Sequence, residues 1–469
     1  MNRVVFYCSC SLLLFIVIHY LIGFDGLYGQ DAYEYLRYTD AIKTFLVSGK
    51  PPGDYFWGVY YPIFGSFLSF IVPNTAFALQ LLSAISLVIT SIYIEKIIRL
   101  LYPDESVGWF PFLFFTLSPI VLIHSFLVMS DLLACCFTTV AIYFLLLFSK
   151  VVKTKTIVLG IAFTSLAILT RYASFVVLFP FGLWALITII KHKKYSILVY
   201  AIFILAIIAI PHLWIRSQNS LQFLSHEWLN SWQITNLFQR NFSTVDGEMH
   251  NHFINLIYIF FSFAHPIFLV FGSVLVITIL LKSDFHLDRY QKLILTAIVI
   301  YALFIGGIPF QNKRFLLVSF PLVVVLLFPF IQNLILSVKY KKALFVSIGI
   351  LQISLGLYFG KPFYDRNCLE KNVATQLKPY QNQTLYSFDI DIALQGRKLA
   401  FNYQSLFSKK YSQFEENALV LVNENQIWKQ WKGKNPAVNL LNLKKNYRLI
   451  LIKKYNPDWK LYQIQSRKI

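Results

Sequence analysis

The chain has 469 residues, of which 57% are hydrophobic and only 14% are charged. Because a soluble domain typically carries about a quarter charged residues, this composition excludes a soluble globular core and indicates a membrane protein. The net charge of +20 is scattered between apolar runs and forms no stripe, so basic loops between membrane spans explain it better than a nucleic-acid interface.

Apolar stretches long enough to cross a bilayer recur along the chain, and we count about eleven of them. The first is interpreted as a retained span, because its apolar run is long and no small-residue cleavage site follows it. Residues 61–72 could add a partial or re-entrant span. The expected spans are 4–24, 75–98, 108–127, 131–149, 156–170, 173–190, 196–215, 253–281, 293–309, 315–336 and 343–359.

Basic residues cluster at alternate connections between these spans, so all the clusters fall on one side of the membrane. The positive-inside rule makes that side the cytoplasm. We therefore expect a multi-pass protein of the plasma (inner) membrane, with its N-terminus in the cytoplasm and its C-terminal domain outside. The clusters are Arg3, Lys96 with Arg99, Lys150 with Lys153 and Lys155, Lys191 with Lys193 and Lys194, Lys282 with Arg289 and Lys292, and Lys339 with Lys341 and Lys342.

The expected architecture is a polytopic α-helical membrane domain at 1–360, with a first outer loop at 25–74, and a small extracytoplasmic α/β domain at 361–469. In the tail, short apolar runs such as 418–422 and 448–452 alternate with polar turns, which is typical of strands. The tail carries 19 Lys and Arg against 8 Asp and Glu. Long domains translocate largely regardless of charge, so this excess does not move the tail inside.

The first outer loop carries two carboxylates directly after the first span. Asp31 and Glu34 are three residues apart, so they share one face if the loop is helical. Residues 31–49 can form an amphipathic helix that lies on the membrane. A group of aromatic residues follows at the level of the lipid headgroups. It consists of Tyr55, Phe56, Trp57, Tyr60 and Tyr61.

Each of these carboxylates has two possible roles. Asp31 is either a base or metal ligand beside an attacking hydroxyl, or a residue that caps the following helix. Glu34 is either a second catalytic carboxylate or a helix-face residue paired with Arg37.

Other ionisable residues gather on the same outer side. Asp131 begins a span after Ser130, and is either a helix cap or a second carboxylate of a cavity. Arg171 and the pair Lys313-Arg314 lie at the outer ends of other spans. They either reach for lipid headgroups or grip a phosphate, which arginine binds with two parallel hydrogen bonds.

In these residues the chain resembles the polyprenyl-phosphate-sugar-dependent glycosyltransferases of the GT-C fold, among them the protein O-mannosyltransferases and the bacterial transferases that add aminoarabinose to lipid A. The resemblance covers nearly the whole length, including the soluble outer tail. It rests on Gly29 to Leu36 after the first span, Tyr61 to Phe64, Leu117-Ser118-Pro119 through Met129-Ser130-Asp131, Leu169 to Tyr172, and Asn312 to Leu316 followed by Pro321.

The resemblance implies an inverting transfer of a sugar from a polyprenyl phosphate in the outer leaflet. By this resemblance Asp31 is the catalytic acidic residue of the first loop, Asp131 is a second acidic residue of the cavity, and Arg171 and Arg314 lie on the phosphate side. Where the family often has two adjacent acidic residues, Ala32 follows Asp31 here, so the role of Glu34 and the metal dependence both stay open. The substrate- and lipid-contacting residues are expected to be Tyr33, Arg37, Tyr60, Tyr61 and Tyr172.

No cofactor follows with certainty from the sequence, although a divalent cation on Asp31 and Asp131 is possible. The expected partners are the lipid bilayer, a polyprenyl-phosphate-linked sugar, and a glycolipid, cell-envelope polymer or protein as acceptor, with no nucleic acid. Two alternatives stay open. One is a transporter or flippase of lipid-linked sugars, which predicts charged residues in broken helices at mid-membrane. The other is a scaffold whose tail recruits partners.

Overall fold

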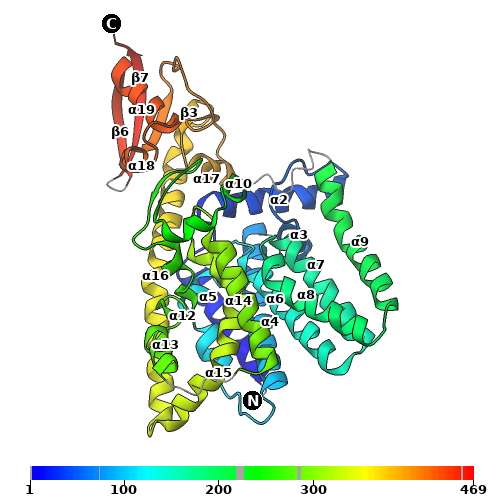
Figure 1. The fold of residues 1–469 in the computed structure, drawn as a ribbon. Coiled ribbons are helices and arrows are strands. Elements are labelled where there is room, and N and C mark those ends of the chain that lie inside the picture. Colours follow the sequence, from blue (N-terminus) through cyan, green and yellow to red (C-terminus); the bar gives the residue numbers. More distant parts are fainter. Residues whose placement is uncertain (1–2, 73, 218–226, 282–286, 456–457, 469) are drawn as a thin grey trace.

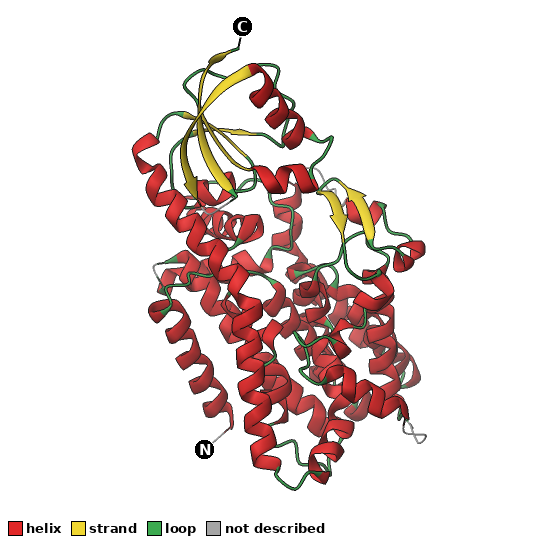
Figure 2. Ribbon diagram, turned by 90° about the vertical axis from the view of Figure 1, so that its left-hand side faces the viewer, coloured by secondary structure: helices red, strands yellow, loops and turns green. Residues whose placement is uncertain are grey.

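The computed structural model describes residues 3–72, 74–217, 227–281, 287–455 and 458–468, and the statements below concern these residues. Long helices stand side by side in a bundle, and a small sheet domain projects from one end of it (Figures 1 and 2). The protein is a polytopic helical membrane protein with a small C-terminal α/β domain, as the sequence predicts.

Six helices in the described part of the chain are long and apolar enough to span a bilayer. They are α4 (Thr75–Leu101), α6 (Asp131–Val151), α8 (Ser174–Lys191), α9 (Ser196–Ser217), α14 (Arg289–Gly306) and α16 (Lys341–Leu377). Shorter apolar helices complete the bundle. They are α1 (Arg3–Ile16) with the π-helical turn η1 (Val17–Leu21), α3 (Tyr60–Ile71), α7 (Thr154–Thr170) and α15 (Phe320–Ser337).

Two expected spans are not continuous helices. The stretch 108–127 divides into η2 (Phe112–Thr116) and α5 (Pro119–Phe126), because the residue before a proline is pushed out of helical geometry. The stretch 253–281 consists of three short helices, α11 (Asn255–Tyr258), α12 (Phe261–Ala264) and α13 (Gly272–Leu281).

The break in the second stretch has two physical causes. Pro266 disfavours helical geometry at His265, which is extended. The buried side-chain amide of Asn255 donates hydrogen bonds to the carbonyls of Gly306 and Ile308, both at 2.9 Å, and so fixes this stretch against the end of α14.

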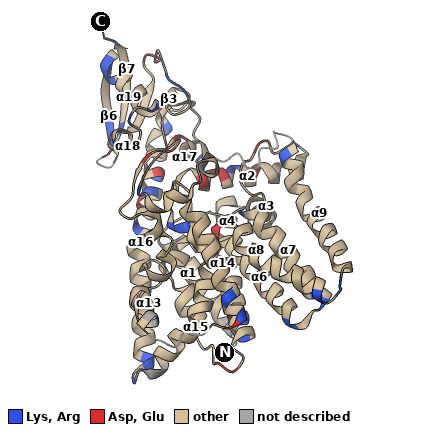
Figure 3. Ribbon diagram, viewed as in Figure 1, with Lys and Arg blue, Asp and Glu red and all other residues tan. Residues whose placement is uncertain are grey.

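The basic connections gather at one end of the bundle. Lys150 at the end of α6 donates to the carbonyl of Leu100 in α4 at 2.5 Å, and its ammonium lies 5.2 Å from the ring of Tyr290 in α14. Figure 3 shows Lys and Arg at the end of the bundle near the N-terminus, and Asp and Glu around α2 and α17 at the other end. Lys282 of the predicted clusters lies outside the described residues.

The loop after the first span forms α2 (Gly29–Ser48), which lies across the end of the bundle that carries the C-terminal domain (Figure 1). This is the amphipathic helix expected at 31–49. Its apolar face buries Ala32, Tyr35 and Ile42. At Gly26, just before the helix, φ is +76° and a β-carbon would lie 2.6 Å from a backbone oxygen, so only glycine fits this turn.

The second outer loop begins with residues outside the described part, 218–226. It continues with α10 (Glu227–Asn230), the 3₁₀ turn η3 (Ile234–Phe238) and an antiparallel hairpin of β1 (Asn241–Thr244) and β2 (Gly247–His250). The hairpin touches the C-terminal domain, where Gln430 donates to the carbonyl of Asp246 at 2.8 Å.

The C-terminal domain is built on a five-stranded sheet in the order β4-β3-β5-β7-β6. The strands β4 and β5 pair parallel to β3, and β7 pairs antiparallel to β5 and β6. The predicted boundary at residue 361 falls inside α16, which runs without a break from the membrane into the domain (Figure 1). The elements are η5 (Lys378–Tyr380), β3 (Thr384–Ser387), α17 (Asp391–Gly396), β4 (Asn402–Ser405), β5 (Leu419–Asn423), α18 (Glu424–Gln430), α19 (Asn435–Asn446), β6 (Tyr447–Tyr455) and β7 (Trp459–Arg467).

Candidate active site

An ion pair joins the first outer loop to the loop before α15. A guanidinium nitrogen of Arg314 lies 2.6 Å from a carboxylate oxygen of Asp31. Asp31 stands in the first turn of α2, whose N-cap residue is Tyr28 and makes no side-chain cap bond. Arg314 stands in the 3₁₀ turn η4 (Lys313–Val318), whose cap Asn312 accepts a hydrogen bond from the Arg314 amide at 3.2 Å. The carboxylate of Asp31 therefore faces an arginine and is not the N-cap of its helix.

A second ion pair lies beside the first. Asp131 begins α6 and pairs with Arg171, the residue that ends α7. The Asp131 side chain is only 2% exposed, and that of Arg171 is 17% exposed. A carboxylate buried this deeply is stable only with a charged partner, and Arg171 supplies it.

One aromatic ring connects the two pairs. The guanidinium carbons of Arg171 and Arg314 lie 5.2 and 5.6 Å from the centre of the Phe315 ring, within cation–π range. Tyr35 of α2 also shares a hydrogen bond of 2.7 Å with the hydroxyl of Ser130, next to Asp131. The structure thus brings Asp31, Asp131, Arg171 and Arg314 into one cluster at the end of the bundle that carries the C-terminal domain.

Lys313 lies next to this cluster and, among the described residues, forms no ion pair with a carboxylate. Its ammonium lies 5.7 Å from the ring of Phe359 in α16. Burial lowers the pKa of Lys313 below its ordinary value. Among the described residues, the partner recorded for this half-buried ammonium is the Phe359 ring.

Two of the predicted substrate-contacting tyrosines hold helices together. The Tyr61 hydroxyl is buried and shares a hydrogen bond of 3.0 Å with Ser83. The Tyr60 hydroxyl donates to the carbonyl of Ile208 in α9 at 2.5 Å. Both hydroxyls are engaged inside the protein, and both side chains are buried.

Tyr33 and Tyr172 are also engaged. The Tyr33 side chain is 1% exposed, and its hydroxyl donates to Glu370 of α16 at 2.7 Å. The Tyr172 hydroxyl accepts from Arg216 at 3.2 Å. Tyr33 therefore lies in an internal contact between α2 and α16, not on a surface open to a substrate.

Glu34 forms the ion pair with Arg37 that the sequence allows as one of its two roles. It accepts two hydrogen bonds from Arg37, one of them at 2.7 Å, on the solvent side of α2. Arg37 also donates to the carbonyl of Asp54 at 3.2 Å, so it ties α2 to the loop that follows.

The donor set offers no ready metal site. The described residues contain no group of three or more His, Cys, Asp or Glu side chains that could hold a metal ion. Asp31 and Asp131 are each paired with an arginine instead of with each other.

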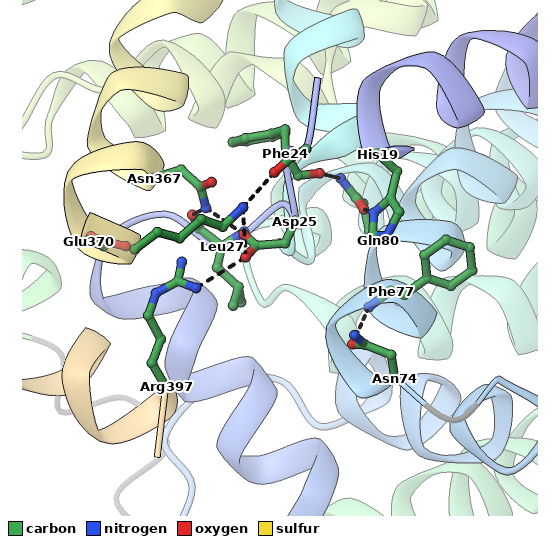
Figure 4. Close-up of polar contacts among 12 residues, drawn as sticks. His19, Phe24, Asp25, Leu27, Asn74, Phe77, Gln80, Asn367, Glu370 and Arg397 are labelled. Atoms are coloured by element: carbon green, nitrogen blue, oxygen red, sulfur yellow. Dashed lines mark hydrogen bonds and ion pairs between the residues drawn. The ribbon is translucent and has the colours of Figure 1, made fainter. Parts of the chain in front are cut away.

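A polar group that the sequence analysis missed lies beside the site. Asp25, between the first span and α2, lies within ion-pair distance of Arg397 and Lys371 and accepts from Asn367 (Figure 4). Burial would raise the pKa of Asp25, but Arg397 and Lys371, with Asn367, hold it below its ordinary value. The position of Asp25 at the end of a span was its only signal in the sequence.

Comparison with known proteins gives a partial match to one family and a match to one fold. Residues 60–215 match the family described as dolichyl-phosphate-mannose-protein mannosyltransferase. This region holds the helices from α3 to α9 and includes Asp131 and Arg171. No curated protein sequence matches the chain.

Among solved structures, the chain is similar to ArnT from Cupriavidus metallidurans bound to undecaprenyl phosphate, with 11% identity, coverage of 98% of both chains and a TM-score of 0.60. The apo state of the same protein gives 11% identity, coverage of 98% and 97%, and a TM-score of 0.58. An oligosaccharyltransferase from Archaeoglobus fulgidus gives 12% identity, coverage of 96% of this chain and 73% of that one, and a TM-score of 0.48.

The two ArnT structures, with TM-scores of 0.60 and 0.58, define the fold. The chain has the GT-C fold of membrane glycosyltransferases, over its full length and with its C-terminal domain included, as the sequence predicts. The match to the mannosyltransferase family model is confined to helices α3 to α9.

Proposed function

We propose that this protein is a membrane glycosyltransferase that moves a sugar from a polyprenyl-phosphate donor to an acceptor on the outer face of the membrane, with inversion at the anomeric carbon. The observation that carries the proposal is the ion pair of Asp31 with Arg314, a base candidate beside a phosphate-binding candidate. The fold of ArnT, which has been solved with undecaprenyl phosphate, and the mannosyltransferase family match support it.

Asp31 is the proposed general base. Its carboxylate is 29% exposed, so an acceptor can reach it, whereas that of Asp131 is 2% exposed. The acceptor hydroxyl or amine gives its proton to Asp31 while its oxygen or nitrogen forms the bond to the anomeric carbon. The bond from that carbon to the phosphate oxygen breaks, and the phosphate leaves with the electron pair.

Arg314 and Lys313 are the proposed partners of the leaving phosphate. Negative charge grows on the phosphate as the bond to the sugar breaks, and cations already in place stabilise it without rearrangement. In the free protein Arg314 is held by Asp31, and its guanidinium fork has further donors for a phosphate. Lys313 forms no ion pair among the described residues and contributes a second positive charge.

Arg171 and Asp131 have a supporting part in the same proposal. Asp131 fixes the guanidinium of Arg171 beside the ring of Phe315, next to Arg314. The pair as a whole is neutral, so Arg171 would serve the phosphate through the guanidinium donors that Asp131 leaves open and not through net charge.

The test is Asp31→Asn in purified enzyme supplied with radiolabelled polyprenyl-phosphate sugars. We expect transfer to fall by about 10²- to 10⁴-fold, the usual contribution of a general base, with expression and folding unchanged. Asp40→Asn is the matched control, because Asp40 is an exposed carboxylate of the same helix that accepts a hydrogen bond from Thr75 at 2.6 Å. Transfer at the wild-type rate in Asp31→Asn would remove Asp31 as the base, and a wild-type protein that moves the donor lipid without consuming it would be a flippase.

A further inference from the structure

The loop that leads into α2 is held by side chains from two other parts of the chain. Asn367 of α16 donates to the carboxylate of Asp25 at 2.5 Å and to the carbonyl of Leu27 at 2.7 Å. Lys371, one turn further, donates to the carbonyl of Gly23 at 2.5 Å. Arg397, which follows α17 in the C-terminal domain, donates to Asp25 at 3.2 Å. Figure 4 shows Asn367 and Arg397 reaching Asp25 from separate helices.

The first turn of α2 is held in the same way. The hydroxyl of Tyr33 donates to Glu370 at 2.7 Å, and the guanidinium of Arg397 lies 5.5 Å from the Tyr33 ring. Gly396 packs so closely on this ring that a β-carbon would lie 2.4 Å from it. Asp31 lies between Leu27 and Tyr33, so the held residues flank it on both sides along the chain.

Glu370 is itself fixed by the C-terminal domain. Arg366, one turn earlier in α16, lies 2.7 Å from Glu370 and 3.0 Å from Asp389, which precedes α17. The side chain of Glu370 is fully buried. The charges of this network balance, with three carboxylates (Asp25, Glu370 and Asp389) against three cations (Arg366, Lys371 and Arg397).

We propose that Arg397 and Glu370 are positioning residues for Asp31. They act through Asp25 and Tyr33, which they hold, and so fix the first turn of α2 on which Asp31 stands. The C-terminal domain is thereby part of the catalytic unit. This inference rests on the proposed function, in which Asp31 is the base.

The contacts of Asp31 explain why its helical turn has to be held by other residues. Within the described residues, the side chain of Asp31 has one strong partner of its own, Arg314, and that partner must also serve the phosphate. The orientation of the base then depends on the backbone of its helical turn. A displacement of a reacting group by about 1 Å can cost about 10²-fold in rate, so a loosened turn lowers the rate of the chemical step.

The experiment compares Arg397→Gln with Lys398→Gln, which removes one positive charge from the neighbouring exposed side chain. For Arg397→Gln we expect kcat to fall about 10- to 100-fold, with the KM for the polyprenyl-phosphate sugar nearly unchanged, because the donor contacts stay in place. Arg397→Lys restores part of the loss because it returns the charge to Asp25. Lys398→Gln behaves as wild type. Tyr33→Phe removes one hydroxyl from the same network and lowers kcat in the same direction, which provides the test if Arg397→Gln does not fold.

Hydrogen–deuterium exchange of peptides that cover residues 24–33 gives a readout without substrate. Faster exchange in Arg397→Gln than in Lys398→Gln supports the proposal, and equal exchange together with an unchanged kcat overturns it. A fall in thermal stability with kcat unchanged in the folded fraction also overturns it, because the role would then be structural. Should Asp31→Asn keep its activity, the proposed function fails. Should Asp31→Asn be inactive while Arg397→Gln works as wild type, only the positioning role fails.

Discussion

At the scale of single residues, the two ion pairs of the site differ in exposure, and this difference sets their roles. The pair of Asp131 with Arg171 is buried, so each partner holds the other in place. The pair of Asp31 with Arg314 is more exposed, at 29% and 20% of the side chains. A substrate can therefore compete for the charges of Asp31 and Arg314. The pair of Asp131 with Arg171 instead joins α6 to the end of α7 beside them.

Breaking the buried pair on one side should destabilise the protein strongly. Asp131→Ala leaves the guanidinium of Arg171 without its carboxylate, and such losses typically cost about 3–5 kcal/mol. The double variant Asp131→Leu/Arg171→Met replaces the pair by apolar side chains and should cost less than Asp131→Ala alone. Unfolding in detergent measures both. A double variant less stable than Asp131→Ala would contradict this account of the pair.

The charged residues of the site can be predicted from the sequence, but which carboxylate pairs with which arginine cannot. Asp31, Asp131, Arg171 and Arg314 stand out as ionisable residues at the ends of apolar spans. Asp31 and Arg314, however, are 283 positions apart, and nothing local to either of them indicates the other. For Tyr33, the position in the loop after the first span suggests a substrate contact. In the structure its hydroxyl instead donates a hydrogen bond to Glu370.

At the scale of helices, composition predicts the long spans well and the interrupted ones poorly. A continuous apolar run has the same composition whether it forms one span or several short buried helices. In 253–281 the interruption comes from Pro266 and from the hydrogen bonds of Asn255 to the end of α14, which only the fold reveals. The single run 343–359 likewise gives no sign that α16 continues to Leu377.

A close approach between two elements gives a prediction at this scale. A β-carbon at Gly58 would lie 2.4 Å and 2.5 Å from the carbonyl oxygens of Leu169 and Thr170, directly before Arg171. Gly58→Ala must therefore push the outer loop away from the end of α7. We expect a loss of about 1–3 kcal/mol in stability, as for other overpacked sites, and reduced transfer because Arg171 moves.

The matched control is Gly182→Ala in α8, where a β-carbon would meet nothing within 4 Å. Alanine favours a helix over glycine by up to about 1 kcal/mol, so this variant should be as stable as wild type or slightly more so. Equal stability of Gly58→Ala and Gly182→Ala would show that the loop yields without cost.

At the scale of the whole molecule, the bundle has two chemically different ends. Basic connections lie at the end near the N-terminus, whereas acidic and basic residues stand together at the other end, around α2 and α17 and at the candidate site (Figure 3). This polarity is what the alternation of basic loops in the sequence predicts. The direction of the bundle in the membrane follows from the positive-inside rule and stays a prediction.

Cys368 tests that direction with a native residue. It is a free, exposed thiol of α16 at the end of the bundle that carries the C-terminal domain. A membrane-impermeant maleimide should label it in intact cells, because the proposed orientation places this end outside. Cys368→Ser should abolish the label. A cysteine introduced in that background as Lys339→Cys, on the exposed connection between α15 and α16, should react only after lysis. The reverse pattern would put the cluster of Asp31 and Arg314 on the cytoplasmic side, where a donor in the outer leaflet could not reach it.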